Sequence, residues 1–347
     1  MNPESHQASP TAKGAAAFCD YPMGPKLRAW LGIRAEDYRG FSSGTPTTAQ
    51  QSDFAAWLAD VFLDREIGTR AELTDIVEEL VGMDLPASAL RLARQYPELI
   101  DGGDFRTMFQ LGNAAMLAGE LSSAEQWFRD AQGLIPEEPA PYVNLGQIFL
   151  HEKRFVEGRE WILAGLEAEP NNPTLWELIG ALEQHENPES AGERLMALAE
   201  ARQSWAGLSL ASDLVDPGDQ LAKLARLDPL YFSGLRDHDF LIELTAVMGA
   251  VGKYDSIPIV VWQAERLGTG ALPWQLWLHL AQAHLAQNGY AACREALVKV
   301  RGSKELPHSV LGVLAELERE CSENDGIPAE TGTATATKSD KASPTLS

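Results

Sequence analysis

Histidine is the residue in this sequence whose spacing comes nearest to a metal site. His151 and His185 are each followed by glutamate, which begins the His-Glu-x-x-His pattern of zinc proteases, but neither has a second histidine four residues later. His279 and His284 are five residues apart, which separates them by about 140° around a helix of 3.6 residues per turn. Side chains on different sides of a helix do not share one ion. The sequence therefore predicts no metal site.

Motifs for other kinds of chemistry are also missing. There is no Gly-x-Gly-x-x-Gly or P-loop sequence to hold phosphates, and no Gly-x-Ser-x-Gly sequence to present a nucleophilic serine. No cysteine lies in the glycine-framed setting of a nucleophile. We therefore predict a protein that is not an enzyme and that needs no cofactor.

The charge balance bears on the kind of partner. Lys and Arg number 28 against 50 Asp and Glu, giving a formal net charge of −22. Such a surface repels nucleic-acid phosphates and anionic lipids, so we expect neither as a ligand. The sequence favours another protein as the partner, with an apolar or basic binding segment. An acidic surface also serves solubility alone, and this alternative stays open.

Targeting and cysteine patterns indicate the compartment. Cys19, Cys293 and Cys321 form no Cys-x-x-Cys pair, which predicts a reducing environment and no disulfide framework. Residues 1–13 lack the basic start and apolar run of a secretory signal. No apolar run approaches the ~20 residues of a spanning helix, so we expect no membrane insertion. We predict a cytoplasmic location, and the sequence leaves the oligomeric state open.

The elements that would position a binding site recur at one fixed interval along the chain. The sets at this spacing are Leu111-Gly112, Leu145-Gly146 and Ile179-Gly180, and likewise Pro136 and Pro170, Phe128 and Ile162, and Met108, Tyr142 and Trp176. The apolar spacing within residues 105–117 predicts one helix, and a second restarts at Leu121. Tryptophans at helical packing positions are expected in the core: Trp127, Trp161, Trp176, Trp262 and Trp277.

At these residues the chain resembles the tetratricopeptide repeat family, whose repeating signature has Leu-Gly, aromatic, Ala and Pro positions at the same interval. The residues that carry the resemblance are Leu111, Gly112, Ala124, Phe128, Ala131, Pro136, Tyr142, Leu145, Gly146, Phe149, Gly158, Ile162, Gly165, Pro170, Trp176, Ile179, Gly180 and Ala199. Ser204 stands where the third unit should have a proline. The resemblance implies an all-α fold, an α-solenoid of stacked helix-turn-helix hairpins with irregular or disordered termini.

The organisation predicted along the chain has five parts. They are a mostly irregular N-terminal arm (1–48), a capping helix and degenerate repeat (49–104), the clearest repeats (105–206), degenerate hairpins with a final capping helix (207–321), and a disordered tail (322–347).

In the family the first helix of each hairpin lines a concave groove, and counting positions predicts which residues would do so here. They are Arg106, Phe109, Gln110, Asn113, Val143, Asn144, Gln147, His151, Glu177 and Gln184. Asn113 and Asn144 match the asparagines with which some family members hold the acidic tails of chaperones. An amide can bond both ways to a peptide main chain. The three cations that accompany them are replaced by Phe109, Thr174 and Leu178, which favours an apolar or mixed ligand.

Three hypotheses follow. The first is a non-catalytic interaction module, an adaptor, assembly factor or chaperone, that binds a peptide or helix of a partner protein in the groove. The second adds autoinhibition, with Leu27, Trp30 and Leu31 of the arm as a pseudo-ligand. The alternative is an enzymatic or small-molecule role for residues 207–321, which an enclosed pocket with converging polar groups would favour. For the asparagines, a role in solvation or turn capping also stays open.

Overall fold

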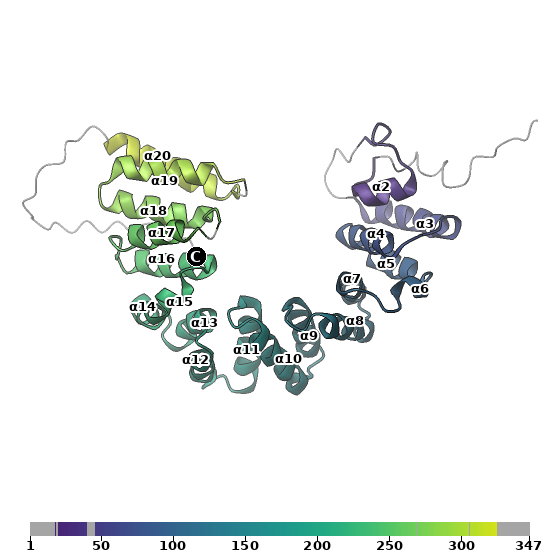
Figure 1. Ribbon diagram of the computed structural model, residues 1–347, viewed down its shortest axis with the longest axis horizontal. Helices are drawn as coiled ribbons and strands as arrows, with labels where there is room; N and C mark the ends of the chain where they lie inside the picture. Colours follow the sequence, from purple (N-terminus) through teal and green to yellow (C-terminus); the bar gives the residue numbers. More distant parts are fainter. Residues whose placement is uncertain (1–17, 19, 40–45, 269, 305, 325–347) are drawn as a thin grey trace, which may run out of the picture. The chain divides into compact units, whose positions relative to one another are not determined.

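The computed structural model describes residues 18, 20–39, 46–268, 270–304 and 306–324, and the regular structure in these ranges is helical (Figure 1). The expected all-α fold is confirmed. Positions 1–17, 19 and 40–45 of the predicted arm, and the predicted tail from position 325, lie outside these ranges. None of the helices in the described part of the chain combines the length and apolar character needed to span a bilayer.

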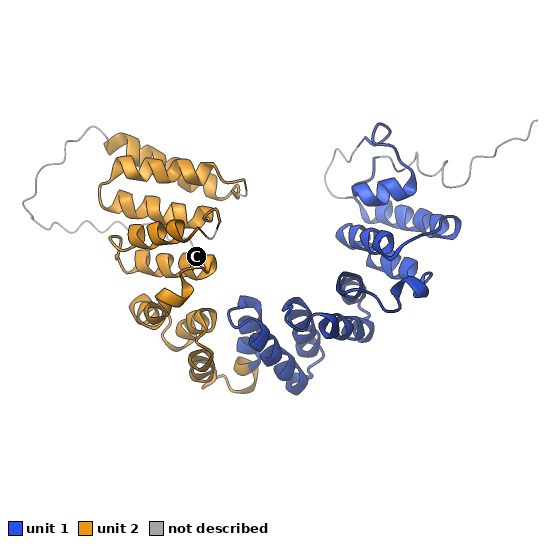
Figure 2. Ribbon diagram, viewed as in Figure 1, with its two compact units in different colours: residues 1–182 blue, residues 183–347 orange. Residues whose placement is uncertain are grey.

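The chain forms two compact units, residues 1–182 and 183–347 (Figure 2). The helices of the first unit are α2 (Pro25–Leu31), α3 (Thr48–Asp64), α4 (Arg70–Gly82), α5 (Pro86–Ala93), α6 (Pro97–Ile100), α7 (Phe105–Leu117), α8 (Leu121–Leu134), α9 (Ala140–His151) and α10 (Phe155–Ala168). Helix α11 (Pro173–Glu186) begins in the first unit and ends in the second. Helices α4 and α5, α7 and α8, and α9 and α10 pair as hairpins, and each pair packs against the next.

The second unit continues the same arrangement. Its helices are α12 (Ala191–Arg202), α13 (Trp205–Val215), α14 (Gln220–Leu227), η2 (Asp228–Leu230), α15 (Tyr231–Gly234), α16 (His238–Ala250), α17 (Ile257–Leu267), α18 (Trp274–Ala286), α19 (Tyr290–Arg301) and α20 (Val310–Asn324). The pairs α13–α14, α16–α17 and α18–α19 pack in succession, and α20 covers α18 and α19.

One turn geometry ends the first helix of hairpin after hairpin. A residue with positive φ is followed by a residue whose N–H donates to the carbonyl oxygen five positions earlier, which is a Schellman motif. The positive-φ residues are Asp84, Gly119, Lys153, Gly252 and Asn288. The hydrogen bonds are Leu85 to Leu80, Glu120 to Ala115, Arg154 to Phe149, Lys253 to Met248 and Gly289 to His284, all at 2.8–2.9 Å. The α16–α17 and α18–α19 hairpins of the second unit therefore turn like those whose sequence signature is clear.

The two helices of a hairpin approach closely where the signature has glycine. A methyl group built at Gly112 would lie 2.5 Å from Cε1 of Phe128, and one at Gly146 would lie 2.9 Å from Cγ1 of Ile162. Phe128 and Ile162, which occupy the same position of successive repeats, are both fully buried. The signature thus records one small-to-large contact that recurs in successive hairpins.

Contacts between successive hairpins also recur at the same spacing. The hydroxyl of Tyr142 donates to the carbonyl oxygen of Pro136 at 2.8 Å, and Nε1 of Trp176 donates to the carbonyl oxygen of Pro170 at 2.8 Å. The third unit departs from the signature at Ser204, and the structure gives the reason. Ser204 is buried and its Oγ accepts from the N–H of Gly207 at 3.1 Å, so it caps α13 in place of a proline turn.

The expectation that the tryptophans are core residues holds fully for Trp176 alone among the five. Trp127, Trp161 and Trp277 are half-buried, and Trp262 is 54% exposed. The prediction for Trp262 was wrong because α17 buries Ile257, Val260, Val261 and Ala264 and turns its other side to solvent. There the guanidinium of Arg266 lies 4.8 Å from the centroid of the Trp262 ring.

The glycine contact makes a testable prediction. Gly112→Ala should lower the free energy of unfolding by about 1–3 kcal/mol, because the buried Phe128 ring leaves no room for the added methyl group. Gly133→Ala is the matched control. Gly133 lies in α8 with nothing within 4 Å of the added methyl group, so the change should stabilise the protein by about 0.5–1 kcal/mol. Urea denaturation followed by circular dichroism measures both, and equal effects would contradict the proposed contact.

Candidate functional site

The groove residues predicted from the sequence lie on the first helices of successive hairpins. Helix α7 carries Arg106, Phe109, Gln110 and Asn113, helix α9 carries Val143, Asn144, Gln147 and His151, and α11 carries Glu177 and Gln184. All ten side chains are half-buried or exposed. Gln184 belongs to the second unit, apart from the other nine residues. We call Arg106, Phe109, Gln110, Asn113, Val143, Asn144 and Gln147 the α7–α9 surface.

The two asparagines of this surface are brought together. Nδ2 of Asn144 donates to Oδ1 of Asn113 at 3.2 Å, and Nδ2 of Asn113 points to Oε1 of Gln110 at 3.5 Å. In the described part of the chain, Oδ1 of Asn144 and one N–H of each asparagine carry no hydrogen bond. The asparagine side chains thus offer both a donor and an acceptor, the pair of groups that a peptide main chain needs.

Beside the asparagines the surface is aromatic. The Phe109 ring stacks on Phe105, with centroids 5.6 Å apart and planes 9° apart, and it lies 5.6 Å from Phe128 at 57°. Phe109 occupies one of the positions where tail-binding repeats have a cation. Because its ring is held by two others, this position presents a fixed apolar face next to the amides.

The edge of the surface next to α4 carries charged side chains that are paired with one another. Arg106 forms ion pairs with Glu78 and with Asp75, the latter at 2.7 Å. Asp75 also accepts from Nζ of Lys26, in the arm, at 2.6 Å. The hydrogen bond from Lys26, joined by that from Arg106, holds the pKa of Asp75 below its usual value. Lys26 and Arg106 therefore share one carboxylate at this edge.

The arm residues proposed as a pseudo-ligand lie in a hydrophobic core. Leu27, Trp30 and Leu31 are buried together with side chains of α3 and α4, and the Trp30 ring lies 5.9 Å from Phe62. Helix α2 packs on α4, and α3 packs on α5. The pair α2–α3 thus occupies the place of a hairpin that precedes α4–α5.

A carboxylate of α4 fixes the start of the arm helix. Glu79 accepts from the N–H of Lys26 at 2.8 Å and from the N–H of Leu27 at 2.7 Å. The residue before this helix is Gly24, whose added methyl group would lie 2.2 Å from the Glu79 carboxyl carbon. Gly24 has no side chain to accept hydrogen bonds from the first N–H groups of α2, and the Glu79 carboxylate accepts them instead. A side chain at position 24 would occupy the place of that carboxylate.

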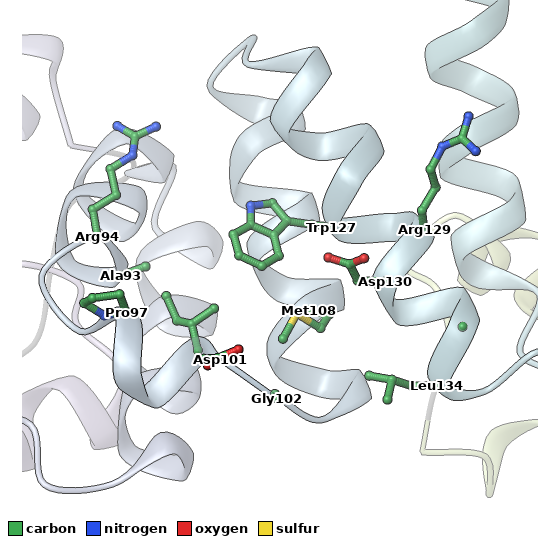
Figure 3. Close-up of a pocket in the computed structure, with 13 residues that line it drawn as sticks. Ala93, Arg94, Pro97, Asp101, Gly102, Met108, Trp127, Arg129, Asp130 and Leu134 are labelled. Carbon is green, nitrogen blue, oxygen red and sulfur yellow. The ribbon is translucent and has the colours of Figure 1, made fainter.

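A cavity of about 750 Å³ lies elsewhere in the first unit, between α5–α6 and α8 (Figure 3). Trp127 and Met108 line it, with Arg94 and Arg129 on opposite sides. Three of its charged groups are engaged within the protein, since Arg94 pairs with Glu120, Arg129 with Glu125, and Asp130 accepts from Gln126. Asp101 also lines the cavity. The lining of the cavity is mostly apolar. Sequence reasoning did not point to it, because it depends on the short α6, which interrupts the repeat period.

The second unit contains a polar cluster that bears on the alternative function. Nζ of Lys223 lies 2.7 Å from Glu243 and 3.0 Å from Asp213, and Oγ of Ser209 donates to Glu243 at 2.6 Å. Burial opposes the charged form of Lys223, but the two carboxylates outweigh it and raise its pKa. The raised pKa favours the protonated form of Lys223, which suits an ion pair with both carboxylates. The cluster is better explained as a link among α13, α14 and α16, and it gives an enzymatic role for residues 207–321 no support.

Next to this cluster lies His279. Its Nδ1 is 2.8 Å from Oγ1 of the buried Thr245. Burial lowers the pKa of His279, and the nearby Glu243 offsets this only in part. No group of three or more His, Cys, Asp or Glu side chains in the described residues is placed to hold a metal ion.

The recurring Schellman turn, the glycine contacts at Gly112 and Gly146, and the matching bonds of Tyr142 and Trp176 coincide with the signature positions. The chain has the tetratricopeptide repeat fold. This confirms the resemblance stated from the sequence, and it extends the repeat into the second unit, where signature residues are few.

No protein-family model and no curated protein matches the sequence. Solved structures to which the chain is similar include a tetratricopeptide repeat protein from Parabacteroides merdae, at 16% identity and TM-score 0.34, covering 73% of this chain and 98% of that one. The chain is also similar to the Cut9–Hcn1 hetero-tetramer of the APC/C, at 11% identity and TM-score 0.38, covering 78% of this chain and 52% of that one. A third similar structure is the TPR2AB domain of yeast Sti1 in complex with pHSP90, at 13% identity and TM-score 0.30. The match covers 73% of this chain and 98% of that one. At such identities the assignment of the fold rests on the contacts within this chain.

The pKa of His279 predicts acid sensitivity. Because this pKa is lowered, the folded state binds fewer protons than the unfolded state below about pH 6.5, so stability should fall as pH drops from 7.5 to 5.5. In His279→Gln the midpoint of thermal unfolding should fall less over this interval, by at least about 1 °C. The exposed His151→Gln is the control and should behave as the parent. An equal fall in all three proteins would exclude His279 as a source of the pH dependence.

Proposed function

We propose that this protein is a non-catalytic interaction module, an adaptor, assembly factor or chaperone, that holds an extended segment of a partner protein on the α7–α9 surface. The observation that carries the proposal is the Asn113–Asn144 pair, which leaves a donor and an acceptor unused on an accessible face. These two amides bond to each other across two helices, and the bond is partly exposed. Their arrangement is explained by a ligand main chain that replaces water on the remaining groups.

The character of the ligand follows from the rest of the surface. Phe109 and Val143 offer apolar contact, while Arg106 is already engaged by two carboxylates. A ligand anchored by a terminal or side-chain carboxylate would find no unpaired cation among these residues. We therefore propose an apolar or mixed segment, bound through its main chain by the amides and through one or two apolar side chains near Phe109. The cytoplasmic location stays a prediction.

Replacing the amides tests this function. The double variant Asn113→Ala, Asn144→Ala should lose partner capture from native extract by about ten-fold or more, because two main-chain hydrogen bonds are removed. Its free energy of unfolding should stay within about 1 kcal/mol of the parent, since the lost amide bond is partly exposed. Quantitative mass spectrometry of captured proteins and circular dichroism measure the two effects.

The matched control is Gln126→Ala. Gln126 is an exposed amide on the outer helix α8, and its Nε2 donates only to Asp130 at 2.8 Å. This variant should capture the same partners as the parent. If the double variant captured them equally well, the α7–α9 surface would not be the binding site.

A second proposal concerns the arm. Helix α2 caps the α3–α4 end of the first unit, and Lys26 shares the Asp75 carboxylate with Arg106 beside the α7–α9 surface. The autoinhibition hypothesis therefore takes a specific form, in which a partner that engages this edge displaces α2. Displacement uncovers Leu27, Trp30 and Leu31 together with the core of α3 and α4, which favours the docked state in the absence of a partner.

Glu79→Ala tests the docking, because it removes both hydrogen bonds to the start of α2. Amides 27–33 should exchange hydrogen at least about ten-fold faster than in the parent. Glu78→Ala, which removes a carboxylate that pairs with Arg106 instead, is the control and should leave this exchange unchanged. Tighter partner binding by Glu79→Ala would support autoinhibition, and faster exchange with unaltered binding would leave α2 as a cap only.

A further inference from the structure

Two cysteines far apart in the sequence meet in the second unit. Cys293 lies in α19 and Cys321 lies in α20, and their Sγ atoms are 2.9 Å apart. Both side chains are fully buried. The two sulfur atoms are within about 1 Å of the length of a disulfide bond. The sequence alone predicted no disulfide framework, because its three cysteines form no Cys-x-x-Cys pair, and these two lie 28 positions apart.

The position of the pair gives it a structural consequence. Helix α20 is the last helix of the described chain, and it packs on α18 and α19 through Val310, Leu314, Leu317 and Cys321. Besides these apolar contacts, α20 is held by an ion pair of Glu318 with Arg301, at 2.7 Å between Oε2 and Nη2. Cys293 itself stands at the small-residue position of its repeat. The cysteine pair therefore joins the C-terminal turns of the final helix to the last hairpin.

We propose that Cys293 and Cys321 are a site of reversible oxidation, at which a low-molecular-weight disulfide such as oxidised glutathione converts the two thiols into an intrachain disulfide that fastens α20 to α19. The reduced and oxidised proteins then share one fold but differ in how readily α20 opens. Neither the interaction function proposed above nor the α7–α9 surface is needed for this inference, which rests on the second unit alone.

The reaction proceeds by two thiol–disulfide exchanges. The thiolate of Cys321 attacks one sulfur of the reagent, forms a mixed disulfide and releases one reagent thiolate. The thiolate of Cys293 then attacks the Cys321 sulfur, forms the Cys293–Cys321 bond and releases the second reagent thiolate. The protein loses two electrons and two protons, and the reagent takes up both as two thiols.

Access to the sulfur atoms controls the rate. Burial, together with the hydrogen bond to Cys321, raises the pKa of Cys293 to about 12, so little thiolate is present while α20 is docked. Cys321 lies in the last turns of α20, where opening from the helix end exposes it first. Oxidation therefore requires transient opening of α20, and the new bond suppresses that same motion.

Intact mass and peptide mapping test the proposal in the full chain with Cys19→Ser, so that only the two cysteines remain. After treatment with oxidised glutathione and alkylation under denaturing conditions, the protein should have lost two hydrogen atoms and bear no alkyl group. Trypsin should release residues 267–294 linked to residues 320–338. Two alkylated thiols, or a stable glutathione adduct at either cysteine without closure, would overturn the proposal.

Hydrogen exchange supplies a second readout that does not depend on partner binding. Amides of α20 should exchange at least about ten-fold more slowly in the oxidised protein than in the reduced one, and the unfolding midpoint should rise by roughly 5 °C or more. The variant with Cys321→Ala in the same background should show neither change on treatment. Exchange of α20 that is equal in both redox states would also overturn the proposal, even if the disulfide forms.

Discussion

Close approach of two helices at a glycine is the constraint from which the first unit is built. At Gly112 and Gly146 the backbone of the first helix lies against a large side chain of the second, and an added methyl group would lie within 3 Å of that side chain. The Schellman turn sets the angle at which the second helix returns. With the hairpin fixed, one face of each first helix is left uncovered by its partner. That face carries the polar positions. Because α7 and α9 lie in successive hairpins, Nδ2 of Asn144 comes within 3.2 Å of Oδ1 of Asn113.

The pairing of individual charges indicates the character of a ligand better than the net charge does. The formal charge of −22 favours a basic partner. Yet the carboxylates of α4 nearest the α7–α9 surface are occupied by Lys26 and Arg106 from the protein itself. The α7–α9 surface therefore offers a ligand amides and aromatic rings. The carboxylate of Asp75 becomes more available only if the arm, with Lys26, withdraws. Specificity would then come from main-chain geometry and apolar contacts more than from long-range attraction.

The sequence predicts the elements of the fold well because each repeat position has a local cause. Glycine at the helix contact and apolar residues every three or four positions can be read directly along the chain. Turns such as those at Lys153 and Asn288 were harder to read, because these residues adopt positive φ without being glycine. Trp262 was misplaced because periodicity identifies a helix without deciding which of two apolar sides is covered.

For the candidate site, the sequence predicted which helix face each residue lies on, but not which side chains contact one another. Repeat counting placed Asn113 and Asn144 on accessible first helices, but no sequence pattern gave the hydrogen bond that joins them. Two further contacts join residues that are distant in the sequence. Lys26 and Asp75 are 49 positions apart, and Cys293 and Cys321 are 28 positions apart. They arise from tertiary packing at the start of the first unit and the end of the second, where the repeat signature is weakest.

Site-specific photo-crosslinking tests the central claim most directly. A photoreactive phenylalanine analogue replaces Gln147, on the α7–α9 surface, or Val156, which is 73% exposed on the outer helix α10. The account predicts that the analogue at position 147 crosslinks to a partner protein in native extract, that the analogue at 156 does not, and that the crosslink disappears when Asn113 and Asn144 are both alanine. Crosslinking from position 156 alone, or from 147 regardless of the asparagines, would contradict it.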